Sequence, residues 1–114
     1  MSEIKRGEIY WLNWNKQRGS EQGGIRPALI IQNDTGNRLS PTVIVAACTT
    51  AANKTYPFLV SVSMKESGLP KDSVINLSHI MTIDAARLEG KSGELSQAKM
   101  AAVDKAIKVS LGME

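Results

Sequence analysis

The fold of this chain is indicated first by two strand-like runs, Glu8-Ile9-Tyr10-Trp11-Leu12-Asn13-Trp14 and Ala28-Leu29-Ile30-Ile31-Gln32. Both runs are rich in the β-branched and aromatic residues that fill a pleated surface. Between them lies Gly19-Ser20-Glu21-Gln22-Gly23-Gly24-Ile25-Arg26-Pro27, whose three glycines permit close approach of a ligand to the backbone. Because Pro27 disfavours the α region at the residue before it, Arg26 is expected in an extended backbone at the entrance of the second strand. The segment is either a ligand-holding loop on a rigid frame or a flexible hairpin with a solvated charge.

Short strands are expected along most of the chain. The candidates are bounded by Gly, Pro, Asn, Asp or Ser and span residues 7–14, 27–33, 42–49, 56–63, 72–77, 79–83 and 88–94. Turn residues separate them at Asn33-Asp34 with Gly36-Asn37, at Ser40-Pro41 and at Gly68-Leu69-Pro70. This spacing is typical of a small antiparallel barrel or half-barrel.

From Ser96 the hydrophobic period becomes helical, with apolar residues three and four apart at Met100, Val103, Ile107 and Leu111. Ser96 is a suitable N-cap, and Gly112 lies just past the expected end. The predicted fold class is therefore mainly β with flanking helices (α+β). It is a small, strongly bent antiparallel sheet or SH3-like barrel with a C-terminal helix packed on it. The length of 114 residues predicts a single domain, 1–114.

The composition favours an ordinary globular protein. Hydrophobic residues make up 42% and charged residues 22%, and no apolar run approaches the roughly 20 residues that span a bilayer. We therefore expect a cytoplasmic protein without membrane contact. The lone Cys48 suits a reducing compartment and is expected as a buried core residue rather than a reactive thiol. A single histidine, a single cysteine and no H-x-x-x-H, C-x-x-C or paired acidic motif predict no metal site and no cofactor. The net charge of +3 permits a polyanionic partner without requiring one.

Several short stretches then stand in a recognisable order along the chain: Lys5-Arg6-Gly7-Glu8-Ile9-Tyr10, Gly19-Ser20-Glu21-Gln22-Gly23-Gly24-Ile25-Arg26-Pro27, Ile31-Gln32-Asn33-Asp34, Gly36-Asn37-Arg38, Ser40-Pro41-Thr42, Ile44-Val45-Ala46-Ala47-Cys48-Thr49, Asp72-Ser73-Val74-Ile75 and Thr82-Ile83-Asp84. Their order and spacing resemble the MazF/PemK family of toxin endoribonucleases, and most of all the short MazF toxins of Gram-positive bacteria. The resemblance covers nearly the whole chain. It implies the MazF/CcdB-like toxin fold, assembled as a two-fold homodimer. It also implies the toxin of a type II toxin-antitoxin system, a sequence-specific, metal-independent endoribonuclease that cleaves single-stranded RNA, mainly mRNA.

Arg26 and Thr49 are the candidate catalytic residues. RNA supplies its own nucleophile, the 2′-hydroxyl, so cleavage needs only protein groups that move protons and stabilise the phosphorane. The planar guanidinium of Arg26 matches two phosphate oxygens and stays charged. Its chemistry favours charge stabilisation, whereas the resemblance implies an acid or base role, and both remain open. Thr49 is by residue type a good strand former, and the resemblance implies a catalytic threonine at this end of the same strand.

Other polar residues are candidates for reading unpaired RNA bases. The resemblance places five of them near the substrate groove: Ser20, Glu21, Gln22, Asn33 and Ser73. His79 is either a base-contacting residue, a general base or an exposed polar residue on a strand. Close relatives tend to carry a Glu-Gln pair where this chain has Ser78-His79; if these positions read bases, the recognised sequence does not follow from the resemblance. Trp11 and Trp14 are either stacking platforms or packing residues of the core or dimer.

The resemblance also implies a MazE-like antitoxin as partner, whose disordered acidic tail binds the toxin dimer. The basic residues Lys16, Arg18 and Arg26 give such a tail a physical reason to bind. Two functions of another class remain as alternatives: a non-catalytic toxin of the same fold that binds DNA gyrase, and a small barrel that only binds RNA. A pure binding protein would not need the pair Arg26 and Thr49.

Overall fold

The computed structural model describes residues 3–14, 24–51 and 55–113. Six strands form one antiparallel sheet in the order β4-β5-β3-β2-β1-β6. The strands are β1 (Glu8–Asn13), β2 (Ile25–Ile30), β3 (Thr42–Thr50), β4 (Leu59–Val62), β5 (Ser73–Asp84) and β6 (Leu88–Glu94). The helices are α1 (Asp34–Leu39), α2 (Met64–Ser67), a 3-10 turn η2 (Ala85–Arg87) and α3 (Gln97–Leu111). The predicted class, a bent antiparallel sheet with a C-terminal helix, is confirmed.

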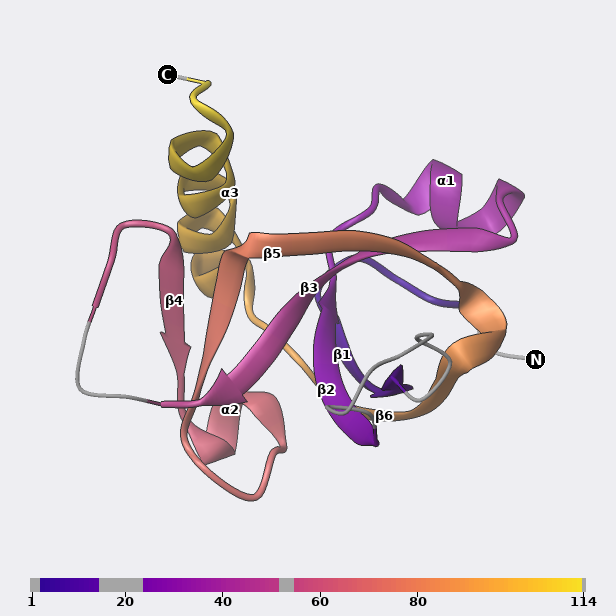
Figure 1. The fold of residues 1–114 in the computed structure, drawn as a ribbon, viewed down its shortest axis with the longest axis horizontal. Coiled ribbons are helices and arrows are strands. Elements are labelled where there is room, and N and C mark those ends of the chain that lie inside the picture. The colour runs from indigo at the N-terminus through magenta and orange to yellow at the C-terminus, as the bar shows by residue number, and fades with distance from the viewer. Residues whose placement is uncertain (1–2, 15–23, 52–54, 114) are drawn as a thin grey trace.

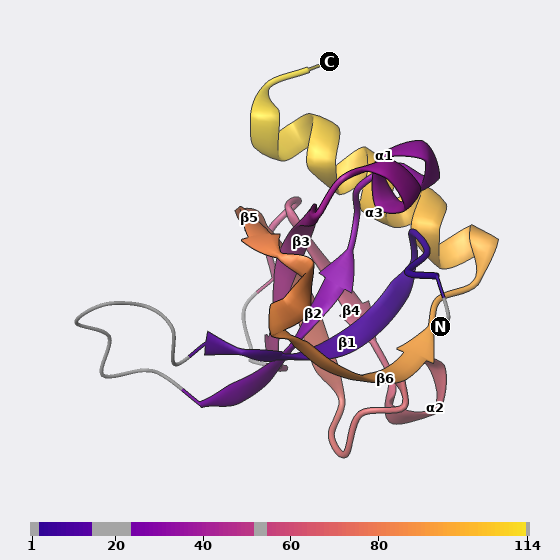
Figure 2. The ribbon, with the colours of Figure 1, turned by 90° about the vertical axis from the view of Figure 1, so that its right-hand side faces the viewer.

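The sheet is bent so strongly that it has two separate cores, one on each side. Neighbouring residues of one strand point to opposite faces, so Leu29 belongs to one core cluster and Ile30 to the other. The long strand β5 contributes to both clusters, through Ile75 and Ile83. Its pairing with β3 shifts register between Ala46 and Ala47, and Figures 1 and 2 show β5 curving across the molecule. The strands predicted at 72–77 and 79–83 are therefore one bent strand.

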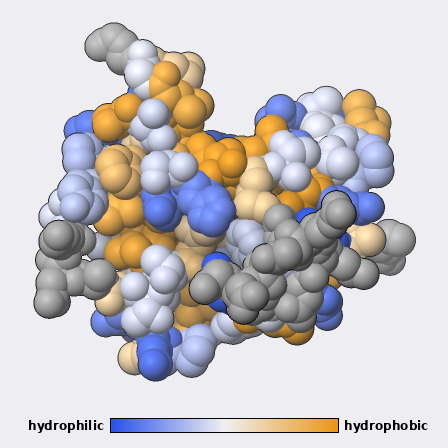
Figure 3. Space-filling view, in the orientation of Figure 1, coloured by the Kyte–Doolittle hydropathy of each residue, from blue (hydrophilic) through white to orange (hydrophobic). Residues whose placement is uncertain are grey.

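The helix α3 packs on the β4 and β5 end of the sheet (Figure 1). Its caps are those predicted: the Ser96 side chain accepts a hydrogen bond from Lys99 N, and Gly112 ends the helix in a left-handed conformation. The α3 residues Val103 and Ala106 are buried. The prediction that the apolar stripe of α3 packs on the sheet is wrong at its C-terminal end, where Leu111 is 58% exposed. Figure 3 shows hydrophobic residues gathered on the surface around this end of α3.

Two short helices were not predicted. The stretch from Asn33 to Asn37, expected as a turn, begins helix α1, whose first turn is capped by the Asn33 side chain accepting from Gly36 N. The strand expected at 56–63 ends at Val62, because Ser63 and Glu66 form a reciprocal capping box that starts α2. At α2 the capping residue Ser63 directly follows the last residue of β4.

Candidate functional site

A pocket of about 290 Å³ opens where β2, β3 and the segment after α2 meet. Its floor is formed by buried residues, among them Cys48, Leu69 and Ser73. The lining comprises Trp11, Arg26, Pro27, Cys48, Thr49, Thr50, Leu69, Pro70, Lys71 and Ser73. Both candidate catalytic residues therefore face the same cavity.

The pairing of β2 with β3 explains why Arg26 and Thr49 meet. Ala28 pairs with Ala47 in the antiparallel ladder. The same register, continued by two residues along each strand, brings Arg26 opposite Thr49. Residues two apart in a strand share a face, so the two side chains extend beyond the core from the same face of neighbouring strands. Both are exposed at the pocket rim.

Trp14 contacts Arg26 in two ways, through its indole N–H and through its ring. The indole Nε1 donates a hydrogen bond to the Arg26 carbonyl oxygen at 3.3 Å, and the guanidinium carbon lies 5.5 Å from the centroid of the indole ring. Trp14 is only 5% exposed, so its ring is a rigid support. Within the described part of the chain, the Arg26 guanidinium makes no ion pair. A contact through the π face orients the cation while leaving its N–H donors available for a ligand.

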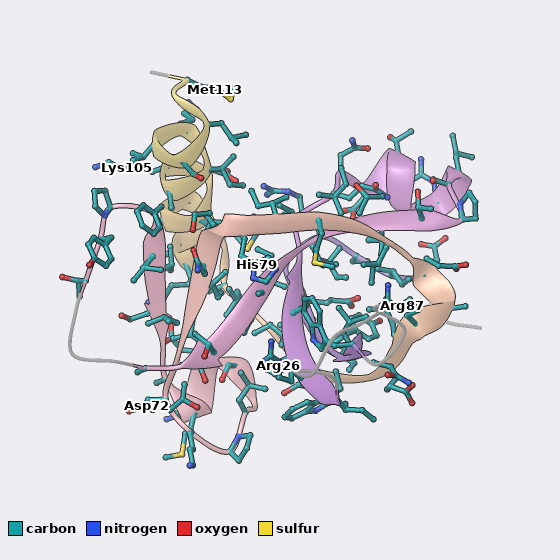
Figure 4. The ribbon with its side chains drawn as sticks, in the orientation of Figure 1. Arg26, Asp72, His79, Arg87, Lys105 and Met113 are labelled. Carbon is teal, nitrogen blue, oxygen red and sulfur yellow. The ribbon has the colours of Figure 1, made fainter. Side chains whose placement is uncertain are left out.

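His79, on β5, lies near this support but does not line the pocket. Its ring centroid is 5.7 Å from that of Trp14, so one indole contacts both His79 and Arg26. Figure 4 shows the His79 and Arg26 side chains near one another in the middle of the view. Of the other residues expected to contact RNA, Ser73 lines the pocket and Asn33 caps α1 away from it. Ser20, Glu21 and Gln22 lie outside the described residues.

The segment from Leu69 to Ser73 supplies lining residues that the sequence did not identify. Three hydrogen bonds hold the segment. Two are made to its backbone: Ser73 Oγ donates to the Lys71 carbonyl at 2.9 Å, and Ala51 N donates to the Asp72 carbonyl at 3.0 Å. In the third, the Asp72 side chain accepts through Oδ1 from Met64 N at 3.0 Å. Lys71 and Pro70 therefore have a fixed position on the rim. The turn residues Gly68-Leu69-Pro70 predicted a turn here, but nothing in the pattern placed it beside Arg26.

The charges of the lining are positive. Among the described residues that line the pocket, the cations are Arg26 and Lys71, and none is a carboxylate or imidazole. Burial raises the pKa of the Cys48 thiol to about 12, so this floor residue stays protonated and uncharged near neutrality. No group of three His, Cys, Asp or Glu side chains is gathered as metal ligands would be in the described ranges. The arrangement can bind an anion between two cations and offer it threonine hydroxyls.

Comparison with known proteins finds the same family along the chain. Residues 5–111 match the family model described as PemK-like, MazF-like toxin of type II toxin-antitoxin system. The chain is 51% identical over 111 residues to an endoribonuclease MazF of Staphylococcus epidermidis, covering 96% of this chain and 92% of that protein.

Solved structures agree. A crystal structure of MazF from Deinococcus radiodurans matches with a TM-score of 0.78 at 29% identity, covering 99% of this chain and 100% of that one. An endoribonuclease in complex with its cognate antitoxin, from a mycobacterial species, matches with a TM-score of 0.79 at 25% identity over 97% of both chains. Within the described residues, no helix has the length and apolar character needed to cross a membrane.

Proposed function

Because the chain belongs to the PemK-like, MazF-like toxins of type II toxin-antitoxin systems, we propose that it is a sequence-specific endoribonuclease that cleaves single-stranded RNA, chiefly mRNA, in the cytoplasm. The observation that supports this activity best is the pocket that joins Arg26 to Thr49. A cation on a rigid aromatic support, beside hydroxyl groups, suits a phosphodiester whose charge increases during reaction.

The proposed reaction uses the ribose itself. The 2′-oxygen attacks the adjacent phosphorus, the bond from phosphorus to the 5′-oxygen breaks, and the products are a 2′,3′-cyclic phosphate and a 5′-hydroxyl. One proton leaves the 2′-hydroxyl and one reaches the 5′-oxygen. The Arg26 guanidinium spans two non-bridging oxygens and stabilises the phosphorane. The Thr49 hydroxyl, which both donates and accepts, fixes the phosphate relative to the 2′-hydroxyl.

The proposal is tested by incubating the pure protein with a long defined RNA in excess EDTA and mapping the cut ends. We expect cleavage to proceed, with a cyclic phosphate at one end of each cut and a hydroxyl at the other. A substrate with one 2′-deoxy sugar at the cut site should stay intact, because the internal nucleophile is missing. Loss of cleavage on chelation would refute metal independence.

Substitution of the two residues tests their roles. Arg26→Ala and Thr49→Ala should each lower the rate by about 100-fold or more, the scale of removing one positioned catalytic group. Both side chains are exposed, so folding should survive. A folded variant with near-full activity would remove that residue from the mechanism. Gyrase poisoning without RNA cleavage by the wild-type protein would support the non-catalytic alternative instead.

We further propose that the protein acts as a homodimer and is neutralised by a MazE-like antitoxin. Solved relatives include MazE-MazF from Deinococcus radiodurans and a mycobacterial endoribonuclease with its cognate antitoxin. Of the cations expected to attract an acidic, disordered tail, Lys16 and Arg18 lie outside the described residues. Arg26, together with Lys71, gives such a tail a reason to cover this pocket.

A competition experiment tests the shared site. A saturating antitoxin tail peptide should abolish both RNA binding and cleavage, and its association rate should fall as salt rises, since screening weakens charge steering. Unchanged RNA affinity in the presence of the peptide would show that tail and RNA use different surfaces.

A further inference from the structure

The pocket offers more than a place for phosphate. Its volume of about 290 Å³ lies near the lower end of the range for small-molecule sites, about 300–1,000 Å³. Polar side chains line the pocket from β2, from β3 and from the segment after α2, and Trp11, Leu69 and Pro70 contribute apolar surface. A phosphate group alone gains nothing from such surface, but a flat nucleobase does.

The structure gives Trp11 and Trp14 different environments, which the sequence alone did not distinguish. Trp14 is buried and supports Arg26. Trp11 is half-buried, packs against the other core cluster and lines the pocket. It pairs with Pro27, so its side chain starts from the sheet face opposite to that of Arg26, and the two residues share the lining of the pocket. A partly exposed aromatic ring in the same pocket as a phosphate-binding cation is an arrangement by which proteins stack unpaired bases.

Lys71 lies on the same rim and is fixed there by its backbone. Its carbonyl accepts the hydrogen bond of the buried Ser73 hydroxyl, and its neighbour Asp72 is tied to Ala51 and Met64. Within the described residues, the Lys71 ammonium makes no ion pair. It is therefore a second cation available for an anion that enters the pocket.

We propose that the pocket is a nucleotide subsite: the apolar wall of Trp11, Leu69 and Pro70 holds the base adjacent to the scissile phosphate, and Lys71 binds a neighbouring phosphate. This inference rests on the proposed function, because it assumes that Arg26 and Thr49 bind the scissile group. It assigns a stacking contact to Trp11 and an electrostatic contact to Lys71.

The stacking contact is tested by combining protein and RNA changes. The RNA carries a 2′-deoxy sugar at the mapped cut site, so that binding is measured without cleavage, and one abasic nucleotide at each flanking position in turn. With wild-type protein, one abasic position should weaken binding about 5-fold or more, the loss of one base–aromatic stack. With Trp11→Leu, which keeps apolar bulk, the parent RNA should already bind more weakly, and the same abasic change should cost less than about twofold.

An independent fluorescence readout covers the case in which Trp11→Leu does not fold. Binding of the parent RNA to the wild-type protein should quench tryptophan emission, and the RNA with the critical abasic position should not, because Trp14 is buried away from the base. Trp11→Phe should keep part of the abasic coupling, since it keeps an aromatic face. If the abasic change weakens binding by the same factor in the wild type and in Trp11→Leu, the base subsite is wrong. It is also wrong if both RNAs quench tryptophan emission equally.

Lys71→Met tests the second contact and has a matched control in Lys105→Met. Lys105 is exposed on α3 (Figure 4), far from Arg26 in this view. Removal of one phosphate contact should reduce the slope of log Kd against log salt by about 0.7. Lys105→Met should leave the slope unchanged, and an unchanged slope for Lys71→Met would overturn its assignment. Absence of cleavage of unmodified RNA by the wild type would instead refute the proposed function.

Discussion

Trp14→Leu should lower kcat while leaving KM for RNA nearly unchanged. The change removes two interactions that hold Arg26: the contact between guanidinium and indole at 5.5 Å and the hydrogen bond to the Arg26 carbonyl at 3.3 Å. Because Arg26 is exposed, the first is worth about 0.5–1 kcal/mol, and the long hydrogen bond about the same. If both act mainly on the position of Arg26 in the transition state, their loss of about 1–2 kcal/mol slows kcat roughly 5- to 30-fold.

Trp14→Phe separates the two interactions. Phenylalanine keeps an aromatic face but lacks the N–H donor, so its effect on kcat should lie between the wild type and Trp14→Leu. Trp14 is buried, and replacing so large a side chain should also lower the free energy of unfolding by about 2–4 kcal/mol. Single-turnover cleavage should therefore be measured well below the melting temperature of each variant. A folded Trp14→Leu protein with wild-type kcat would refute the idea that this indole positions Arg26.

Three further outcomes follow from particular residues. Burial raises the pKa of Cys48 from 9.0 to about 12, so the unfolded state loses its thiol proton first. The free energy of unfolding in urea should then fall above about pH 9, by up to about 1.4 kcal/mol per pH unit, and Cys48→Ala should lack this fall. Gly68→Ala should be much more destabilising than Gly112→Ala in thermal melts: both glycines have positive φ, but a Cβ at Gly68 collides with the Ser92 carbonyl oxygen, whereas that at Gly112 meets open space. His79→Ala should change the mapped cut-site preference more than the maximal rate, because His79 does not line the pocket; a large rate loss with the same cut sites would contradict this.

Local rules predicted the long helix and the positions of most strands, although the two strands expected at 72–77 and 79–83 are one strand, β5. Ser96 and Gly112 bound α3 as expected, and the strand expected at Leu88 to Glu94 has those bounds. Helix α2 was missed although Ser63 and Glu66 have capping-box spacing, because the apolar alternation before them favoured a strand through Ser63. Helix α1 was missed because Gly36 and Asn37 are poor helix formers. The single-domain extent 1–114 stays a prediction.

The candidate site was predictable only in part. Neighbouring strands permit Arg26 and Thr49 to meet, and the β2–β3 register together with the shared pocket brings them together. The contribution of Lys71 depends on Thr50 pairing with Ser73, a contact between β3 and β5 that local sequence pattern does not specify. The catalytic and RNA-binding roles of Arg26, Thr49, Ser20, Glu21, Gln22, Asn33, Ser73 and His79 stay predictions.

The strand β1 has a consequence for how the protein is made. It lies between β2 and β6, with Glu8 paired to Glu94, so β1 finds one of its two partners only after residues 88–94 have been synthesised. Pairings so distant in sequence close slowly. Until β6 arrives, β1 is an open sheet edge that can pair with another chain. A nascent chain released before residue 88 therefore lacks the frame that fixes Trp11. We expect such fragments to be inactive and prone to aggregation, which delays any toxicity until β6 has been synthesised.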